Sequence, residues 1–189
     1  MLRWLAAAAV VLVQATSLLP IGTFRITPGE SRVEFVMRDN RGGFTGITDR
    51  VEGTVIIRGE ADTFTATVDG RIDARTLVTG NGMRDAQMRR DFLRTEQFPF
   101  VTFKGTATNR DRASATMMRV LMKGQLTIRD ATHDIEIPFD VTALADEYRA
   151  SGEVVVKMSE YGIPIPRFLI FVAEDPVTVR LRVRLRRNG

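Results

Sequence analysis

Apolar and polar residues alternate along most of this chain, which predicts half-buried strands of an antiparallel sheet. The clearest example runs from Phe64 to Ile72, where apolar or small residues occupy every second position and threonine or charged residues lie between them. The same pattern predicts eight strands, at Ser31–Met37, Val51–Arg58, Phe64–Ile72, Val101–Ala107, Met118–Ile128, Ile135–Ala143, Tyr148–Met158 and Val177–Leu185. No long helical segment separates them, so we predict an all-β fold, an eight-stranded antiparallel barrel. Met118–Ile128 alone would span roughly 35 Å, which predicts an elongated barrel.

One stretch, Thr79 to Phe103, interrupts the alternation. Asn81 is a suitable helix N-cap, so about two helical turns can run from Gly82 to Arg90. The apolar residues of this helix fall on two sides, which suits a segment that covers an apolar opening. Pro99 forces the residue before it into an extended conformation, and strand periodicity then resumes. We therefore expect a short helical lid around residues 82–90.

The start of the chain predicts export. Arg3 provides a positive charge, an apolar run follows from Leu5 to Val13, and residues 15–17 are small enough for cleavage. This run is shorter than the roughly 20 apolar residues that a membrane span requires. We expect residues 1–17 to be a cleaved signal peptide, with an uncleaved membrane anchor as the alternative. Residues 18–189 should then form a single domain in the periplasm.

Composition narrows the possible chemistry. The chain has no cysteine and one histidine, His133, so a disulfide scaffold, thiol chemistry and a multi-histidine metal site are excluded. It also lacks a G-x-S-x-G nucleophile elbow and a phosphate-binding glycine loop with its lysine, and no pair of carboxylates is singled out. We predict that the protein is not an enzyme and that it carries no cofactor or metal.

The net charge of +4 is concentrated in the last predicted strand. Five arginines and no acid follow Val177, so the rest of the chain sums to −1. A solvated outer face is the commoner reason for such a ladder, and attraction to an anionic membrane or lipid headgroup is the alternative. Nucleic-acid binding usually requires a broader basic surface, so we expect no nucleic-acid partner.

The sequence leaves open whether the barrel is hollow. Eight strands are close to the size at which a barrel either fills with its own side chains or holds one small ligand. Small residues within otherwise bulky strands favour a cavity, although such residues also serve bulges and barrel corners. They are Gly53, Ala66, Gly70, Gly105, Ala107 and Gly124. A filled-core barrel that acts as a protein-interaction or stress-related envelope module, without a lipid ligand, is the alternative.

Four segments, in order along the chain, resemble the YceI-like polyisoprenoid-binding family. The first is Gly42–Gly46, which resembles the family's G-x-F-x-G turn, and the second is the set of T-G-N-x-x-R-D, D-F and F-P-x-x-T-F patterns within Thr79–Phe103. The third is the G-x-L-T-I pattern of Gly124–Ile128 with Thr132 and Pro138, and the fourth is Ser159–Ile163, which resembles the S-x-x-G-I turn. The similarity spans about residues 24–185. Two positions depart from the family: Gln87 stands where many relatives have a histidine, and Arg129 replaces a common glycine.

The resemblance implies a lipocalin-like barrel that binds, sequesters or transports a long-chain isoprenoid lipid of the polyprenyl phosphate or quinone type. We assign twelve residues to its apolar lining: Phe35, Met37, Phe44, Phe64, Leu77, Met83, Met88, Phe92, Phe103, Leu126, Ile128 and Phe168. The headgroup would meet Asn81, Arg84 or Arg89, because arginine can bind a phosphate with two hydrogen bonds and a quinone needs only a donor.

Three further questions stay open at this stage. Arg84 and Asp85 have a purely structural alternative, in which they tie the lid to the barrel rim. The segment from Tyr161 to Phe171, with two prolines followed by four apolar residues, would be a second rim loop or an apolar contact surface. Peripheral contact with a membrane and a homodimer are the other partnerships that we consider.

Overall fold

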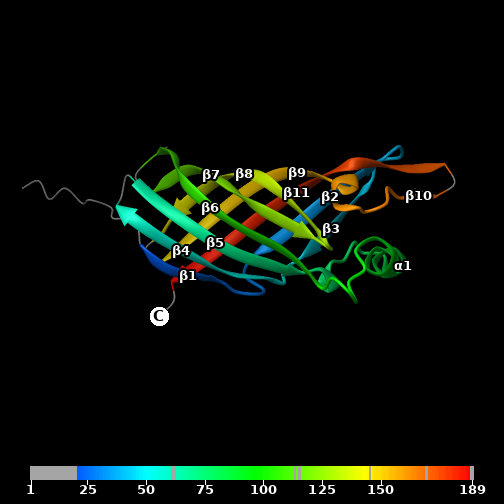
Figure 1. The fold of residues 1–189 in the computed structure, drawn as a ribbon, viewed down its shortest axis with the longest axis horizontal. Helices are drawn as coiled ribbons and strands as arrows, with labels where there is room; N and C mark the ends of the chain where they lie inside the picture. Colours follow the sequence, from blue (N-terminus) through cyan, green and yellow to red (C-terminus); the bar gives the residue numbers. More distant parts are fainter. Residues whose placement is uncertain are drawn as a thin grey trace, which may run out of the picture.

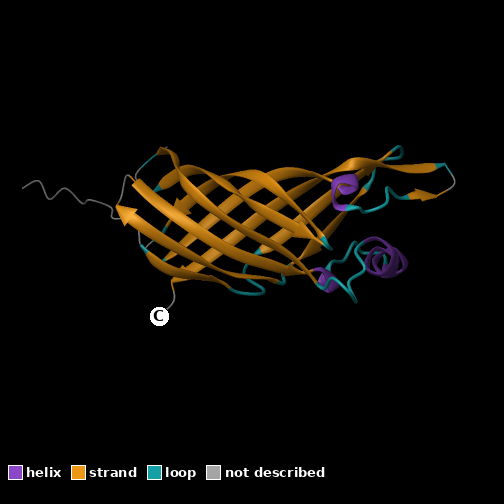
Figure 2. Ribbon diagram, viewed as in Figure 1, coloured by secondary structure: helices purple, strands orange, loops and turns teal. Residues whose placement is uncertain are grey.

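The computed structural model describes residues 21–60, 63–112, 114, 116–144, 146–168 and 170–187. It is an elongated barrel of strands, with its helical turns gathered at one end (Figure 1, Figure 2). The strands are β1 (Gly22–Ile26), β2 (Arg32–Asp39), β3 (Phe44–Thr48), β4 (Val51–Glu60), β5 (Thr63–Asp73), β6 (Phe100–Arg112), β7 (Met117–Ile128), β8 (Ala131–Ala143), β9 (Glu147–Lys157), β10 (Arg167–Phe168) and β11 (Phe171–Arg187). The helical elements are η1 (Ala74–Thr76), α1 (Gly82–Gln87), the π-helical turn η2 (Met88–Phe92) and η3 (Met158–Tyr161). The predicted signal peptide, residues 1–17, lies outside the described residues.

The barrel is closed, antiparallel and eight-stranded, as predicted, but two of its eight strands are interrupted. Both β1 and β2 pair antiparallel with β11, one after the other along the same edge. In the same way, β4 pairs with β1 and β3 pairs with β2. Thus β1 and β2 form one broken strand and β3 and β4 a second, while β5, β6, β7, β8, β9 and β11 complete the ring.

The two interruptions lie side by side. The first contains Pro28, which has no backbone N–H for a sheet, and Gly29, whose φ is +88°. The Gly29 N–H donates to the carbonyl oxygen of Asp49, in the second interruption, at 2.8 Å. The break in one strand is therefore hydrogen-bonded to the break in its neighbour, and the barrel bends there without losing closure.

The alternating pattern predicted the long strands but not β1, β3 or β10. The most instructive error concerns Gly42–Gly46, which we expected to be a turn. Gly42 and Gly43 do form the turn after β2, with φ values of +130° and +99°, but Phe44 and Gly46 lie within β3. Five residues are too few for alternation to identify a strand when three of them are glycine or threonine.

A cluster of buried apolar side chains lies at the end of the barrel away from the lid. Phe24 is fully buried there and packs edge-on against Tyr148, with ring centroids 5.1 Å apart. Burial raises the pKa of Tyr148 to about 12, so its phenol stays neutral. A second apolar cluster, which includes Met158, Tyr161 and Ile163, lies at the lid end. Residues of both clusters also line the site described below.

The arginine ladder of β11 lies on the outer face of the barrel and is paired with acids on neighbouring strands. Arg180 bridges Glu34 and Glu153, with nitrogen–oxygen distances of 3.2 and 2.8 Å. Arg186 pairs with Glu30 at 2.9 Å, and Arg184 pairs with Glu147. Exposed pairs of this kind each contribute only about 0–1 kcal/mol, so the ladder marks which face is solvated more than it stabilises the barrel.

Acid should weaken the fold through carboxylates whose pKa is lowered in the folded chain. Hydrogen bonds from Arg184 lower the pKa of Glu147, and hydrogen bonds from Ser159 lower the pKa of Asp175. Each carboxyl group binds its proton less tightly in the folded chain than in the unfolded chain. Its contribution to the stability of the fold is therefore fully present above the unfolded pKa of about 4, and it is lost as the pH falls through the lower folded pKa. We expect the urea concentration at the unfolding midpoint to decrease as the pH is lowered below about 4. A midpoint that rises on acidification would contradict this assignment.

Candidate ligand-binding cavity

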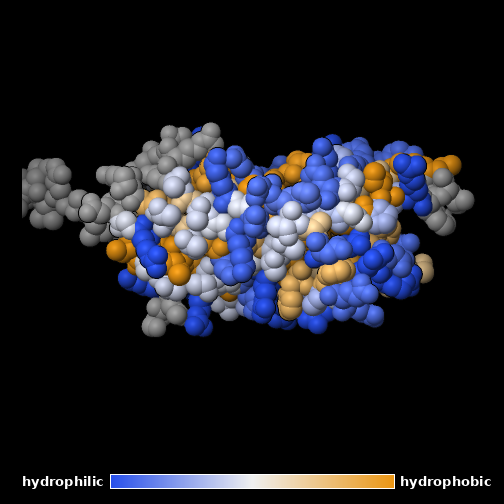
Figure 3. All heavy atoms as spheres, in the orientation of Figure 1, coloured by the Kyte–Doolittle hydropathy of each residue, from blue (hydrophilic) through white to orange (hydrophobic). Residues whose placement is uncertain are grey.

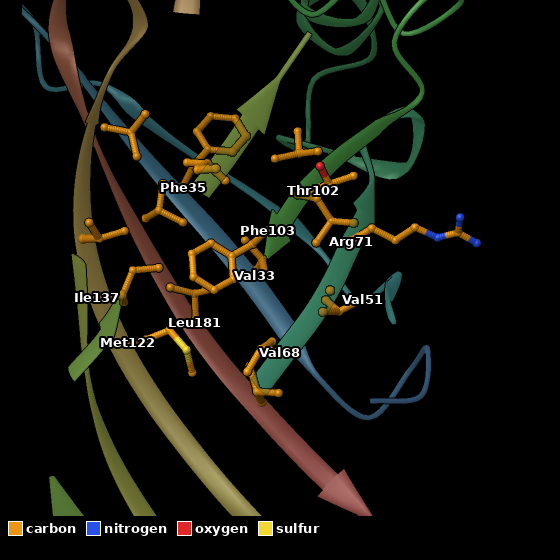
Figure 4. Close-up of a pocket in the computed structure, with 18 of the residues that line it drawn as sticks. Val33, Phe35, Val51, Val68, Arg71, Thr102, Phe103, Met122, Ile137 and Leu181 are labelled. Atoms are coloured by element: carbon orange, nitrogen blue, oxygen red, sulfur yellow. The ribbon is translucent and has the colours of Figure 1, made fainter. Parts of the chain in front are cut away.

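The barrel encloses an apolar cavity of about 430 Å³. This is roughly thirty times the 15 Å³ or so that a single water molecule needs by the same measure. Figure 4 shows how Val33, Phe35, Phe103, Met122 and Leu181, from four different strands, converge on this space. Arg71 points away from it, toward Glu52, whose Oε1 accepts a hydrogen bond from Nε at 2.6 Å. A filled-core barrel would have side chains in this space, and the structure has a cavity.

Pairs of glycines at inward positions create part of the cavity. Gly53 lies opposite Gly70 across β4 and β5, and Gly105 lies opposite Gly124 across β6 and β7. The ring of Phe103 covers the second pair so closely that a Cβ atom on Gly105 or Gly124 would come within 2.7 or 2.8 Å of its Cζ atom. Phe103 can therefore lie along the wall instead of across the bore.

Two other phenylalanine rings also lie over glycines. Phe35 lies over Gly46 and Phe139 lies over Gly152, which are their respective cross-strand partners. In each case a glycine across the ladder gives the ring room to lie flat against the sheet. Three large inward side chains thus line the interior without blocking it, which explains how a barrel of this size stays hollow.

Ten of the twelve residues that we assigned to the lining do line the cavity: Phe35, Met37, Phe44, Phe64, Leu77, Met88, Phe92, Phe103, Leu126 and Ile128. The exception is Met83, which is 85% exposed and does not reach the cavity. Met83 lies on the solvent side of α1, whereas the π-helical turn that follows Gln87 brings Met88 and Phe92 to the cavity. The side chain of Phe168 lies outside the described part of the chain.

Many wall residues were not on our list. They include Val55, Val68, Val120, Met122, Ile137, Val141, Val179, Leu181 and Val183. All of them lie on the inward face of a strand that the alternating pattern predicts. Because every second residue of a strand points to the same face, the position of each residue along its strand was the signal that could have identified it. The predicted set is weighted toward aromatic and sulfur-containing side chains, whereas most of the wall is aliphatic.

Thr79 is the centre of the hydrogen-bond network that fixes the lid. The buried carboxylate of Asp85 accepts hydrogen bonds from the backbone N–H of Thr79, at 2.8 Å, and from its hydroxyl, at 2.6 Å. Arg84 donates from Nε to the same hydroxyl at 2.8 Å and from Nη2 to the Thr79 carbonyl oxygen at 3.1 Å. Asn81 caps α1, as predicted, by accepting a hydrogen bond from the Arg84 N–H at 3.1 Å.

The lid arginines already have partners within the protein. The Arg84 guanidinium lies 4.0 Å from the centre of the Phe44 ring, which joins the lid to β3. Arg89 donates to the carbonyl oxygen of Leu77 at 3.2 Å. Of the three residues assigned to the headgroup, Arg84 reaches the cavity wall, whereas Asn81 and Arg89 lie off it. The alternative that Arg84 and Asp85 hold the lid on the rim agrees with these contacts.

Gln87 is the polar lid residue that our assignment missed. It lines the cavity and is also exposed to solvent, so it marks a place where the cavity meets the surface. Unlike Arg84, its side-chain amide makes no hydrogen bond to another of the residues that the structure describes. Its position in the family pattern, where many relatives have a histidine, was the signal that pointed to it.

The segment from Tyr161 to Phe171 forms part of the rim opposite the lid. Tyr161 is buried, and its ring forms a T-shaped pair with the His133 ring at a centroid distance of 5.0 Å. Ile163 and Pro166 line the cavity, and β10 then pairs with β11. His133 is itself exposed, and its Nε2 lies 2.8 Å from the carbonyl oxygen of Glu160.

Arg129 has a backbone conformation that favours glycine. It begins the two-residue turn between β7 and β8 with φ = +59°, and its Nη1 donates to the Gly162 carbonyl oxygen at 2.7 Å. Replacement by glycine or by alanine removes this hydrogen bond in both cases. We therefore expect R129G to be more stable than R129A by about 1 kcal/mol in urea denaturation. Equal stability of the two variants would show that the positive φ is not strained.

Among the residues that the structure describes, no helix is long and apolar enough to cross a bilayer. The same residues contain no group of three or more His, Cys, Asp or Glu side chains placed to hold a metal ion.

A closed antiparallel barrel around one elongated apolar cavity is the architecture of barrels that hold a single small ligand. The sequence model of the YceI-like domain matches residues 24–185, and the chain belongs to this family. The comparison with curated proteins found no match.

Three solved structures share the fold at low sequence identity. BcnA of Burkholderia cenocepacia has a TM-score of 0.71 and 16% identity, over 84% of this chain and 98% of BcnA. A polyisoprenoid-binding domain from Saccharophagus degradans, described as implicated in plant cell wall breakdown, has a TM-score of 0.67 and 15% identity, over 89% and 100%. The YceI protein of Campylobacter jejuni has a TM-score of 0.56 and 18% identity, over 71% and 81%.

Proposed function

We propose that this protein is a non-enzymatic carrier that binds a long isoprenoid lipid inside its barrel, and that it sequesters or transports this lipid in the periplasm. The observation that carries the proposal is the unfilled apolar cavity that extends along the barrel. Membership of the YceI-like family and the fold shared with a polyisoprenoid-binding domain support the choice of ligand class.

The cavity wall suits the tail of such a lipid. Burial of each methylene group is worth about 0.8 kcal/mol, so a long chain gains ample binding free energy from an apolar wall without specific polar contacts. The inner walls of the bore are built almost entirely from aliphatic and aromatic side chains. The protein should therefore select for chain length and slenderness more strongly than for the chemistry of the headgroup.

A neutral, hydrogen-bonding headgroup fits the lid better than a phosphate. The guanidinium groups of Arg84 and Arg89 already contact Thr79, Phe44 and Leu77, so a phosphate would have to displace these partners. The amide of Gln87 is available and can both donate and accept a hydrogen bond. We therefore favour a quinone-type lipid over a polyprenyl phosphate.

Mass spectrometry of organic extracts from the purified, full-length protein tests the proposal. We expect an isoprenoid lipid in the extract, and uptake of one molecule of an isoprenoid quinone per chain by the delipidated protein. Uptake of a polyprenyl phosphate of equal chain length should be weaker. Repeated recovery of lipid-free protein that takes up neither compound would overturn the proposal.

A further inference from the structure

Two turns from distant parts of the chain are joined at the lid end of the barrel. One follows β2, at residues 39–43, and the other comprises Ile170 and the start of β11 as far as Val172; we call them the rim turns. The Asn40 side chain links them, because its Nδ2 donates to the Ile170 carbonyl oxygen at 2.7 Å and its Oδ1 accepts from the Val172 N–H at 3.4 Å. In Figure 1, β10 and the start of β11 extend beyond the lid at this end of the molecule.

The second rim turn presents apolar side chains to solvent. Ile170 is 62% exposed and Val172 is 43% exposed, although their backbones are held by Asn40. In Figure 3 a small group of hydrophobic atoms lies at the tip of this end of the molecule, with hydrophilic atoms beside it. Single exposed apolar residues are common, but neighbouring ones on a fixed turn at the end of a protein indicate a contact surface.

The charged residues around the rim turns favour an anionic partner. Arg38, Arg41 and Arg167 are exposed on or next to these turns. The acids nearby are Asp39, whose Oδ1 accepts a hydrogen bond from the Arg41 N–H at 2.8 Å, and the exposed Glu174. Arginine can extend its guanidinium to a lipid phosphate while its methylene stem stays against apolar surface. An apolar tip with cations beside it matches the interface of a membrane, where acyl chains lie just beneath phosphates.

The rim turns also lie next to the cavity. Met37 and Phe44, which flank the first turn, and Pro166, which precedes β10, all line the cavity. A surface on which the rim turns rested would therefore face the end of the bore that the lid covers.

We propose that the rim turns dock the lid end of the barrel on an anionic bilayer surface, with Ile170 and Val172 inserted between headgroups, so that the lipid ligand passes between membrane and cavity. This inference rests on the proposed function. Binding of a ligand inside the barrel does not require the exposed side chains of Ile170 and Val172, and docking on a membrane gives them a role.

Sedimentation with vesicles tests the docking. The full chain should bind vesicles of phosphatidylcholine and phosphatidylglycerol, and should bind phosphatidylcholine alone more weakly. We expect the double variant I170D/V172D to lose at least about tenfold in partitioning. The matched control is V155D/L144D, which changes residues that are 57% and 40% exposed on another strand and at another turn, and it should bind as the wild type does. Equal binding by both double variants, or no binding by the wild type, would overturn the proposal.

Ligand uptake separates this proposal from the proposed function. The I170D/V172D variant should take up an isoprenoid quinone from detergent solution at the wild-type level but should extract it from vesicles at least about tenfold more slowly. If the wild type binds vesicles but takes up no isoprenoid, docking stands and the proposed ligand is wrong. If it takes up isoprenoid from detergent but does not bind vesicles, the ligand stands and docking is wrong.

Discussion

Replacement of Gly70 by leucine should weaken isoprenoid binding by roughly 10- to 100-fold while the barrel stays folded. Gly70 lies on the cavity wall, and a Cβ atom placed on it would meet only the carbonyl oxygen of Glu52, at 3.8 Å. A leucine there fits the backbone and projects into the bore, where it competes with the ligand for space. Its cross-strand partner Gly53 is different, because a Cβ atom there would come within 2.5 Å of the Asp69 carbonyl oxygen.

The matched control is T67L, which adds the same side chain to the exposed outer face of the same strand. Titration of delipidated protein with an isoprenoid quinone gives the affinity of each variant, and circular dichroism verifies that each is folded. We expect T67L to bind as the wild type does. A folded G70L variant with wild-type affinity would show that the ligand does not occupy the bore at this level.

Replacement of Asp85 by alanine should release the lid and reduce the free energy of unfolding by about 1.5–3 kcal/mol. Asp85 is only 6% exposed, and its carboxylate accepts two hydrogen bonds from Thr79. Its removal leaves the Thr79 N–H without its acceptor and separates α1 from the segment that precedes it. We expect faster amide hydrogen exchange across residues 79–92 and faster release of bound lipid, because the lid covers the end of the bore.

Asp91 provides the control for this change. It lies on the same lid and pairs with Arg90 at 2.7 Å, but it is exposed. The D91A variant should lose less than about 1 kcal/mol and leave lipid release unchanged. If D85A and D91A exchange their lid amides at the same rate, the Thr79 network does not hold the lid closed.

Much of the fold was predictable because alternation depends on local physics. A strand that is buried on one face must place apolar side chains at every second position, and the long strands from β5 onward do so. The lid was predictable for a similar reason, since Asn81 provides a cap that acts within three residues of itself. The broken strands were not predictable, because whether Pro28 ends a strand or interrupts one depends on how β11 pairs with the residues on either side of it.

The hollow interior could not be decided from the sequence. A glycine in a strand reveals nothing about its cross-strand partner, and the bore stays open because Phe35, Phe103 and Phe139 each lie over a glycine. The role of the lid arginines was equally undetermined, since their partners include backbone carbonyls, such as those of Thr79 and Leu77, that carry no signal in the sequence. Gln87 became the better candidate for headgroup contact only when those partners were known.

A crystal structure of the protein saturated with an isoprenoid quinone would test the central claim most directly. We predict continuous electron density along the bore, in contact with Phe103 and Met122, with the quinone ring beside Gln87. Density for the lipid only on the outer surface, with the bore empty or filled by ordered water, would contradict the account.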